Sequence, residues 1–124
     1  VVGGYAVGFH GYPRATADLD IWISTTPSNA ANVERAVREF GFDVPELRAD
    51  LFLQEGTVIR MGEPPIRIEV LTTLSGVSFG ECYASREVAE IEGVHVNFIA
   101  LADLKRNKKA AGRYQDLSDL EHLP

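Results

Sequence analysis

The sequence is poor in cysteine, in basic residues and in long apolar runs. Cys82 is its one cysteine, which excludes an internal disulfide and a cysteine-built zinc site. The 12 Lys and Arg residues are outnumbered by 18 Asp and Glu, and the net charge of -6 argues against binding nucleic acid mainly through phosphate contacts. No apolar run approaches the roughly 20 residues of a membrane span. We therefore expect a cytoplasmic protein that makes no membrane contact.

Several well-known catalytic motifs are also absent, because the chain contains no P-loop, no G-x-S-x-G and no H-E-x-x-H pattern. The 124 residues instead have an average composition for a globular protein, 45% apolar and 24% charged. No internal repeat and no linker interrupts them. This length and composition predict one domain over residues 1–124.

The order of apolar patterns predicts an α+β (mixed α/β) domain, with a twisted mixed β-sheet flanked by helices. Residues 66–71 alternate well, with Ile68 and Val70 on one side and Arg67 and Glu69 on the other. Expected strands cover residues 18–23, 57–61, 66–71, 85–90 and 94–98, with a hairpin turn at 92–93. Expected helices cover residues 5–9, 31–40 (capped by Ser28), 47–54 and two segments within 101–123 that part near Gly112.

The pattern Asp18-x-Asp20 on the first expected strand is the strongest candidate for chemistry. A strand has a side-chain period of two, so both carboxylates lie on the same face. Two neighbouring negative charges repel each other unless a cation lies between them, and hard oxygen ligands suit Mg²⁺ or Mn²⁺. The alternative is a solvent-facing strand edge with two ordinary aspartates.

Two further features bear on that alternative. Gly3-Gly4 lies about 15 residues upstream, at a turn into a short helix, where backbone amides can bind phosphate. Glu69 offers a third carboxylate on an alternating strand, although it also fits an exposed strand position. Three carboxylates beside a phosphate-binding turn are what two-metal phosphoryl transfer requires.

These blocks together resemble the DNA polymerase beta-type nucleotidyltransferase superfamily, in particular its small stand-alone bacterial branch, some relatives of which act as toxins or lie beside toxin–antitoxin genes. The likeness runs through residues 1–7, 11–21, 65–72 and 107–119, in the right order. It implies a nucleotidyltransferase fold, and that Gly3 and Gly4 line a triphosphate. It also implies that Asp18, Asp20 and Glu69 are catalytic and hold two Mg²⁺ or Mn²⁺ ions, with Glu69 as the base on the acceptor hydroxyl.

The sequence departs from that superfamily at three points. Gly4 stands where a serine hydroxyl often helps to hold phosphate, and Glu69 stands where aspartate is common. The chain also opens at what looks like a strand end, so we expect the usual N-terminal helix to be absent. An edge left open in this way would suit a second copy of the chain, and hence a homodimer.

Arg14 and Thr16 belong to the Arg-x-Thr-x-Asp-x-Asp run of the resemblance and are candidate nucleotide-binding residues. Arg14 would contact phosphate through two nitrogens. Alternatively, it pairs with Asp18 or another nearby acid and orders the loop. Thr16 also fits a turn or strand residue whose hydroxyl bonds the backbone.

A basic cluster near the C-terminus reverses the sign of the chain's charge locally. Its members are Lys105, Arg106, Lys108, Lys109 and Arg113. A basic helix facing the carboxylates would hold a triphosphate or another anion, and the resemblance favours Lys108 and Arg113. The alternative is a solvated helix face. Asp116 and Asp119 are expected to organise these cations rather than bind metal, with Asp116 beside Arg113.

Smaller features are interpreted structurally. Tyr5 and Phe9, one helical turn apart, are expected in the core, and Trp22 is expected to be a buried strand aromatic.

The functional hypothesis is a metal-dependent transfer of NMP from an NTP to an acceptor (tRNA, protein or a small molecule) with release of pyrophosphate. The alternative is a catalytically degenerate nucleotide-binding or protein-interaction module of the same fold.

Overall fold

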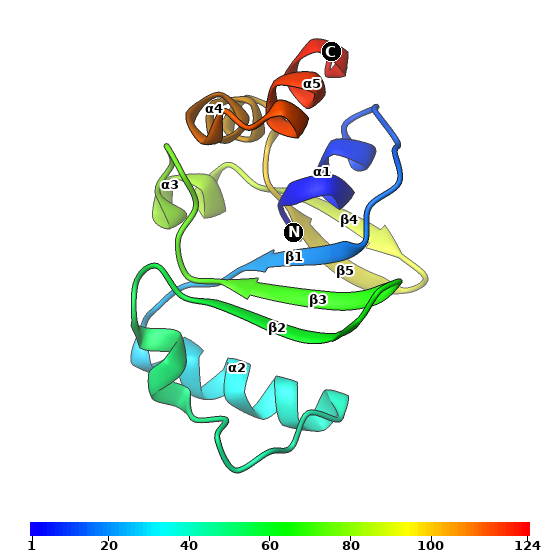
Figure 1. Ribbon diagram of the computed structural model, residues 1–124. Helices are drawn as coiled ribbons and strands as arrows, with labels where there is room; N and C mark the ends of the chain where they lie inside the picture. Colours follow the sequence, from blue (N-terminus) through cyan, green and yellow to red (C-terminus); the bar gives the residue numbers. More distant parts are fainter.

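A computed structural model describes residues 1–124, apart from the side chain of Ile66, and shows a single small α+β domain (Figure 1). In chain order its elements are α1 (Gly3–Phe9), β1 (Asp18–Trp22), α2 (Pro27–Phe40), the 3₁₀ helix η1 (Ala49–Leu53), β2 (Val58–Glu63), β3 (Ile66–Leu71), α3 (Phe79–Ala84), β4 (Glu87–Ile91), β5 (Val94–Phe98), α4 (Leu101–Ala111) and α5 (Tyr114–His122).

The larger sheet has the strand order β1–β3–β2, with β1 parallel to β3 and β2 antiparallel to it. Helix α2 and η1 cover one face of this sheet (Figure 1). Apolar side chains from alternate strand positions, such as Ile21 and Val70, pack there against Val37 of α2 and the fully buried Phe52 of η1. The apolar layer between this face and the two helices is the first of the two hydrophobic cores.

The opposite face of the same strands is polar where the first face is apolar. Asp18 and Asp20 on β1 and Arg67 and Glu69 on β3 follow the period of two and point away from α2. Helices α1, α4 and α5 lie on this side (Figure 1). Alternation therefore assigns packing to one face of the sheet and charged groups to the other.

A second, two-stranded sheet pairs β4 with β5 in antiparallel register. Backbone hydrogen bonds of Val1 and Val2 join it to the larger sheet: the Val2 amide donates to Asp20 O at 3.0 Å, and the Ile99 amide donates to Val1 O at 3.0 Å. The second core forms around this junction, from Val7 of α1, Cys82 of α3, Phe98 of β5 and Leu104 of α4. The two cores together place α1, β1 and α4 around the polar face.

Most of the predicted elements are confirmed, and β3 and β5 have the predicted bounds. The hairpin turn at 92–93 is present between β4 and β5, and Gly112 separates α4 from α5. Helix α2 starts earlier than predicted, because Thr26 rather than Ser28 caps it and Pro27 occupies its first turn.

One helix was missed, and one prediction about side-chain burial is wrong. Helix α3 was not expected, because its short amphipathic pattern is not distinct from that of the strands around it. Tyr5 and Phe9 are not core residues: they are 47% and 41% exposed, since the buried face of α1 is made by Ala6 and Val7. Trp22 is half-buried and meets the ring of Phe79 edge-on at 5.2 Å.

No helix among the described residues combines the length and the apolar character that crossing a membrane requires.

The second core generates a stability prediction. Leu104→Ala removes a side chain with no exposed surface and leaves a cavity beneath α4, so we expect the free energy of unfolding to fall by about 3 kcal/mol. Leu117→Ala is the matched control, because Leu117 of α5 is 46% exposed and its loss should change stability by less than about 1 kcal/mol. Urea unfolding of both variants measures the difference, and equal losses would contradict the placement of this core.

Candidate functional site

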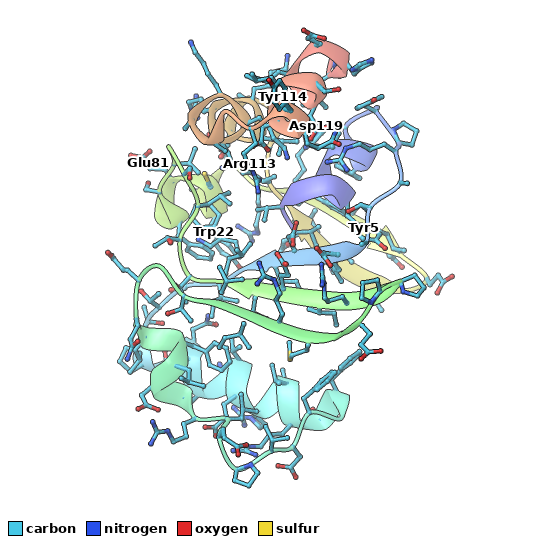
Figure 2. The ribbon with its side chains drawn as sticks, in the orientation of Figure 1. Tyr5, Trp22, Glu81, Arg113, Tyr114 and Asp119 are labelled. Carbon is cyan, nitrogen blue, oxygen red and sulfur yellow. The ribbon has the colours of Figure 1, made fainter. Side chains whose placement is uncertain are left out.

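A cleft of about 710 Å³ lies over the polar face of the larger sheet. All nine site residues predicted from the sequence line it, although they come from five separate stretches of the chain. They are Gly3, Gly4, Arg14, Thr16, Asp18, Asp20, Glu69, Lys108 and Arg113. The cleft is bounded by the strands below and by α1, α4 and the start of α5 above. Arg113 lies between the helices and the strands (Figure 2).

The lower wall carries the three predicted carboxylates together. Asp18 and Asp20 share a face of β1, and the parallel register sets Asp20 directly beside Glu69 of β3. One oxygen from each of Asp18, Asp20 and Glu69 lies within 4.8 Å of the other two. The side chains of Asp18 and Glu69 are 22% and 14% exposed, so both carboxylates are partly buried in the cleft rather than fully exposed on the strand.

Asp20 is the least satisfied member of this acidic triad, the name we use for Asp18, Asp20 and Glu69. Its Oδ1 is buried without a hydrogen-bond partner, and Oδ2 packs against Gly3 so closely that a Cβ at that residue would collide with it. Gly3 also has a φ of +67°, a conformation that favours glycine. Burial, together with the nearby charges of Glu69 and Asp18, raises the pKa of Asp20 to about 7.

The triad has the donor chemistry of a divalent cation site. Three carboxylate oxygens within ion-binding reach of one another suit Mg²⁺ or Mn²⁺, and the unpartnered Oδ1 of Asp20 lacks the positive partner that such an ion would supply. A bound cation would also favour the ionised form of Asp20, whose pKa is raised in its absence. The residues present therefore fit a cation.

Gly4 and Thr16 lie against each other beside the triad. A Cβ at Gly4 would lie 2.7 Å from Thr16 Oγ1 and 2.9 Å from Thr16 Cβ, so a serine has no room there unless Thr16 moves. The hydroxyl of Thr16 thus fills the space that a serine side chain would take, and a hydroxyl still faces this part of the cleft. Its own hydrogen bond, to Asp18 O at 3.4 Å, is long.

The upper wall carries cations that are anchored by two buried carboxylates, as expected of Asp116 and Asp119. Lys108 of α4 is itself buried, and its Nζ lies 3.1 Å from Asp116 Oδ1 and 3.1 Å from Asp119 Oδ2. Asp116 and Asp119 expose 1% and 0% of their surface. The alternative of a wholly solvated basic helix is therefore wrong for Lys108, whereas its neighbour Lys109 is exposed.

Arg14 and Arg113 complete this anchored set. Arg14 donates two hydrogen bonds to Asp119, from Nε at 2.7 Å and from a terminal nitrogen at 2.9 Å. Arg14 therefore does pair with an acid, but its partner is 105 residues away rather than the neighbouring Asp18. Arg113 donates to Asp116 from Nε at 2.7 Å, which confirms the predicted pair, and its backbone amide also donates to Asp116 at 3.1 Å.

These contacts reverse the effect of burial on the two aspartates. Burial alone would raise the pKa of Asp119, but hydrogen bonds from Arg14 and Lys108 hold it below its ordinary range. The same holds for Asp116, with Arg113 and Lys108 as donors. Asp116 and Asp119 are thus fully charged at neutral pH, and together they hold three cations at one wall.

Two arginines of the lower wall were missed as site residues. Arg67 of β3 makes a two-point contact with Asp18, with a second hydrogen bond of 3.1 Å, and Arg60 of β2 lies 2.6 Å from Glu69 Oε1. The alternation of residues 66–71 placed Arg67 on the same face as Glu69 and could have pointed to it. Arg60 carries no such signal, because its contact depends on the pairing of β2 with β3.

The anchored cations generate a stability prediction. Asp119→Asn leaves Arg14 and Lys108 without a full counter-charge in a buried place, so we expect the free energy of unfolding to fall by about 3 kcal/mol at neutral pH. Asp50→Asn is the matched control: its ion pair with Arg48 is exposed and is worth less than about 1 kcal/mol. Urea unfolding compares the two variants, and a loss at Asp119 no larger than at Asp50 would contradict the anchoring role.

The raised pKa of Asp20 predicts that stability falls as pH rises. Between its ordinary pKa of 3.8 and about 7, the unfolded chain ionises Asp20 while the folded protein keeps it protonated, so stability is lost as pH rises through this window. Asp20→Asn removes that loss. We expect the variant to match the wild type near pH 4 and to be more stable by about 2 kcal/mol near pH 8, after allowing for solvent screening. Urea unfolding without divalent cations tests this, and a difference that does not grow with pH would contradict it.

A scan of the sequence against protein-family models finds no match, and a search of the curated proteins finds no significant one. The geometry of the cleft is therefore the observation on which a functional proposal rests.

Proposed function

We propose that the protein is a divalent-metal-dependent nucleotidyltransferase, which transfers an NMP from an NTP to an acceptor hydroxyl and releases pyrophosphate. The observation that carries this proposal is the single cleft, where an acidic triad on one wall faces anchored cations on the other. Phosphoryl transfer needs carboxylates that hold a metal ion and cations that stabilise the charge of the triphosphate.

The roles of the lower wall follow from the placement of its oxygens. Asp18, Asp20 and Glu69 would hold Mg²⁺ or Mn²⁺. When bound, the metal would neutralise phosphate charge and make an acceptor hydroxyl more acidic. Because Gly3 has no side chain, the Asp20 carboxylate can lie against the backbone at the start of α1.

The upper wall would bind the triphosphate. Lys108 is fixed by two buried acids and still lines the cleft, so it presents its charge in one place at little further loss of side-chain entropy. Arg14, 17% exposed, is held by Asp119 from the loop before β1, and Arg113, 79% exposed, pairs with Asp116 at the start of α5. A set of cations already held in place binds an anion better than flexible surface lysines do.

In the proposed reaction the acceptor oxygen forms a bond to the α-phosphorus as the bond to the bridging oxygen breaks. Pyrophosphate leaves with the electron pair of that broken bond, and Arg14, Lys108 and Arg113 stabilise its charge. The proton of the hydroxyl passes to Glu69, the predicted base.

One observation favours a second candidate, a nucleotide-binding or protein-interaction module of the same fold without turnover. Arg67 and Arg60 already neutralise Asp18 and Glu69, so the site has internal counter-charges where the enzyme needs a metal. Such a module would bind a nucleotide through the upper wall alone, and its binding would not depend on Mg²⁺ or Mn²⁺.

A thermal-shift comparison of the four NTPs, each with and without Mg²⁺ or Mn²⁺, tests the proposal. We expect at least one NTP to stabilise the wild type only when metal is present, by about 2.7 kcal/mol at a hundredfold excess over Kd. Asp20→Asn should lose this stabilisation because it removes a ligand of the triad, whereas the control Asp50→Asn, remote from the cleft, should retain it.

The outcomes separate the two candidates. Stabilisation that persists in Asp20→Asn or without metal would contradict the metal-dependent enzyme and favour the module. Metal-dependent binding is then followed by an assay of pyrophosphate release with RNA, protein and small-molecule acceptors. Release that is lost in Asp20→Asn supports the enzyme, and binding without release under all these acceptors favours the module.

A further inference from the structure

Arg67 and Arg60 make cross-strand contacts with three of the six carboxylate oxygens of the acidic triad. The strand register sets Asp18 opposite Arg67 and Glu69 opposite Arg60. Arg67 contacts both oxygens of Asp18, and Arg60 contacts Oε1 of Glu69 at 2.6 Å. Asp20 alone has a buried oxygen without a partner.

The charges of this cluster nearly balance without any added ion. The three carboxylates carry at most three negative charges, and the two guanidinium groups supply two positive ones. A guanidinium with a two-point contact to a carboxylate is a strong, directed partner. A cation held through Asp18 therefore competes with two hydrogen bonds from Arg67, and one held through Oε1 of Glu69 competes with the contact from Arg60.

Both arginine side chains are exposed enough to swing away from the carboxylates. The side chain of Arg60 is 62% exposed and that of Arg67 is 32% exposed, in contrast to the buried Lys108 of the upper wall. Both line the same cleft as the triad. Both arginines lie on the polar face of the sheet, so a change of rotamer requires no rearrangement of the strands.

We propose that Arg67 and Arg60 form a cationic latch on the acidic triad, which holds Asp18 and Glu69 until a divalent cation displaces it. This inference rests on the proposed function, because it assigns these arginines a role toward the metal of that site. The latch holds the two carboxylates in place in the absence of metal, and it weakens metal binding by competition for the same oxygens. A displaced guanidinium remains in the cleft as a counter-charge for the anionic substrate.

Mn²⁺ binding without any nucleotide tests the latch, measured by electron paramagnetic resonance of free Mn²⁺ and by calorimetry. We expect Arg67→Met and Arg60→Met each to bind Mn²⁺ at least tenfold more tightly than the wild type, because the oxygens no longer have a competing partner. Arg67→Lys keeps the charge but loses the two-point contact, and its affinity should lie between those of wild type and Arg67→Met.

Two control variants separate direct competition from a general change of charge. Arg113→Met removes a positive charge from the same cleft but contacts Asp116 rather than the triad, so its Mn²⁺ affinity should rise by less than about threefold. Arg48→Met removes a positive charge from the remote exposed pair with Asp50 and should leave the affinity unchanged.

The outcomes distinguish failure of the latch from failure of the metal site. Equal or weaker Mn²⁺ binding in Arg67→Met and Arg60→Met, with binding in the wild type, overturns the latch and leaves the metal site standing. Absence of Mn²⁺ binding in the wild type and in both variants overturns the metal site and the latch together. Tighter binding in Arg113→Met equal to that in Arg67→Met also overturns the latch, because a general field would then explain it.

Discussion

The buried ion cluster of Lys108, Asp116 and Asp119 is the interaction on which the rest of the site depends. Its two carboxylates take hydrogen bonds from three parts of the chain: the loop before β1, helix α4 and the start of α5. The loop before β1 is distant in sequence from the two helices, and hydrogen bonds to Asp116 and Asp119 bring the three segments together above the sheet. Because a buried carboxylate must be paired, Asp119 draws Arg14 and Lys108 to one point and so fixes the upper wall of the cleft.

The two walls treat their acids in opposite ways. Asp116 and Asp119 are buried and supplied with donors, so their pKa values lie below the ordinary range. Asp20 is partly buried among other acids and lacks a donor at Oδ1, so its pKa is raised. A folded protein satisfies its structural acids, and a carboxylate left in need of a positive partner is a mark of a binding site.

Much of the site could be predicted from local patterns in the sequence. The period of two in β1 gave the face shared by Asp18 and Asp20, and the resemblance brought in Glu69, the glycines and the C-terminal cations. What local patterns lack is cross-strand register and long-range pairing. Arg60 meets Glu69 only because β2 pairs with β3, and Arg14 meets Asp119 across 105 residues.

The errors in the fold have a similar cause. Tyr5 and Phe9 have the spacing of a buried helical stripe, but a seven-residue helix has two faces with apolar character, and the sheet covers the one with Ala6 and Val7. Helix α3 has only six residues, fewer than two helical turns, so its apolar spacing does not distinguish it from a short strand. In both cases tertiary packing decides between patterns that are locally equivalent.

The apolar face of the sheet also bears on the chemistry of the polar one. Ile21 and Val70 pack against the layer of α2 and η1, and they are opposite each other in the same register that sets Asp20 beside Glu69. A slip of one residue between β1 and β3 would turn apolar side chains toward the cleft and separate the carboxylates. The hydrophobic core around Phe52 therefore fixes the register that places the triad although it touches none of it, because the two faces of a strand share one backbone.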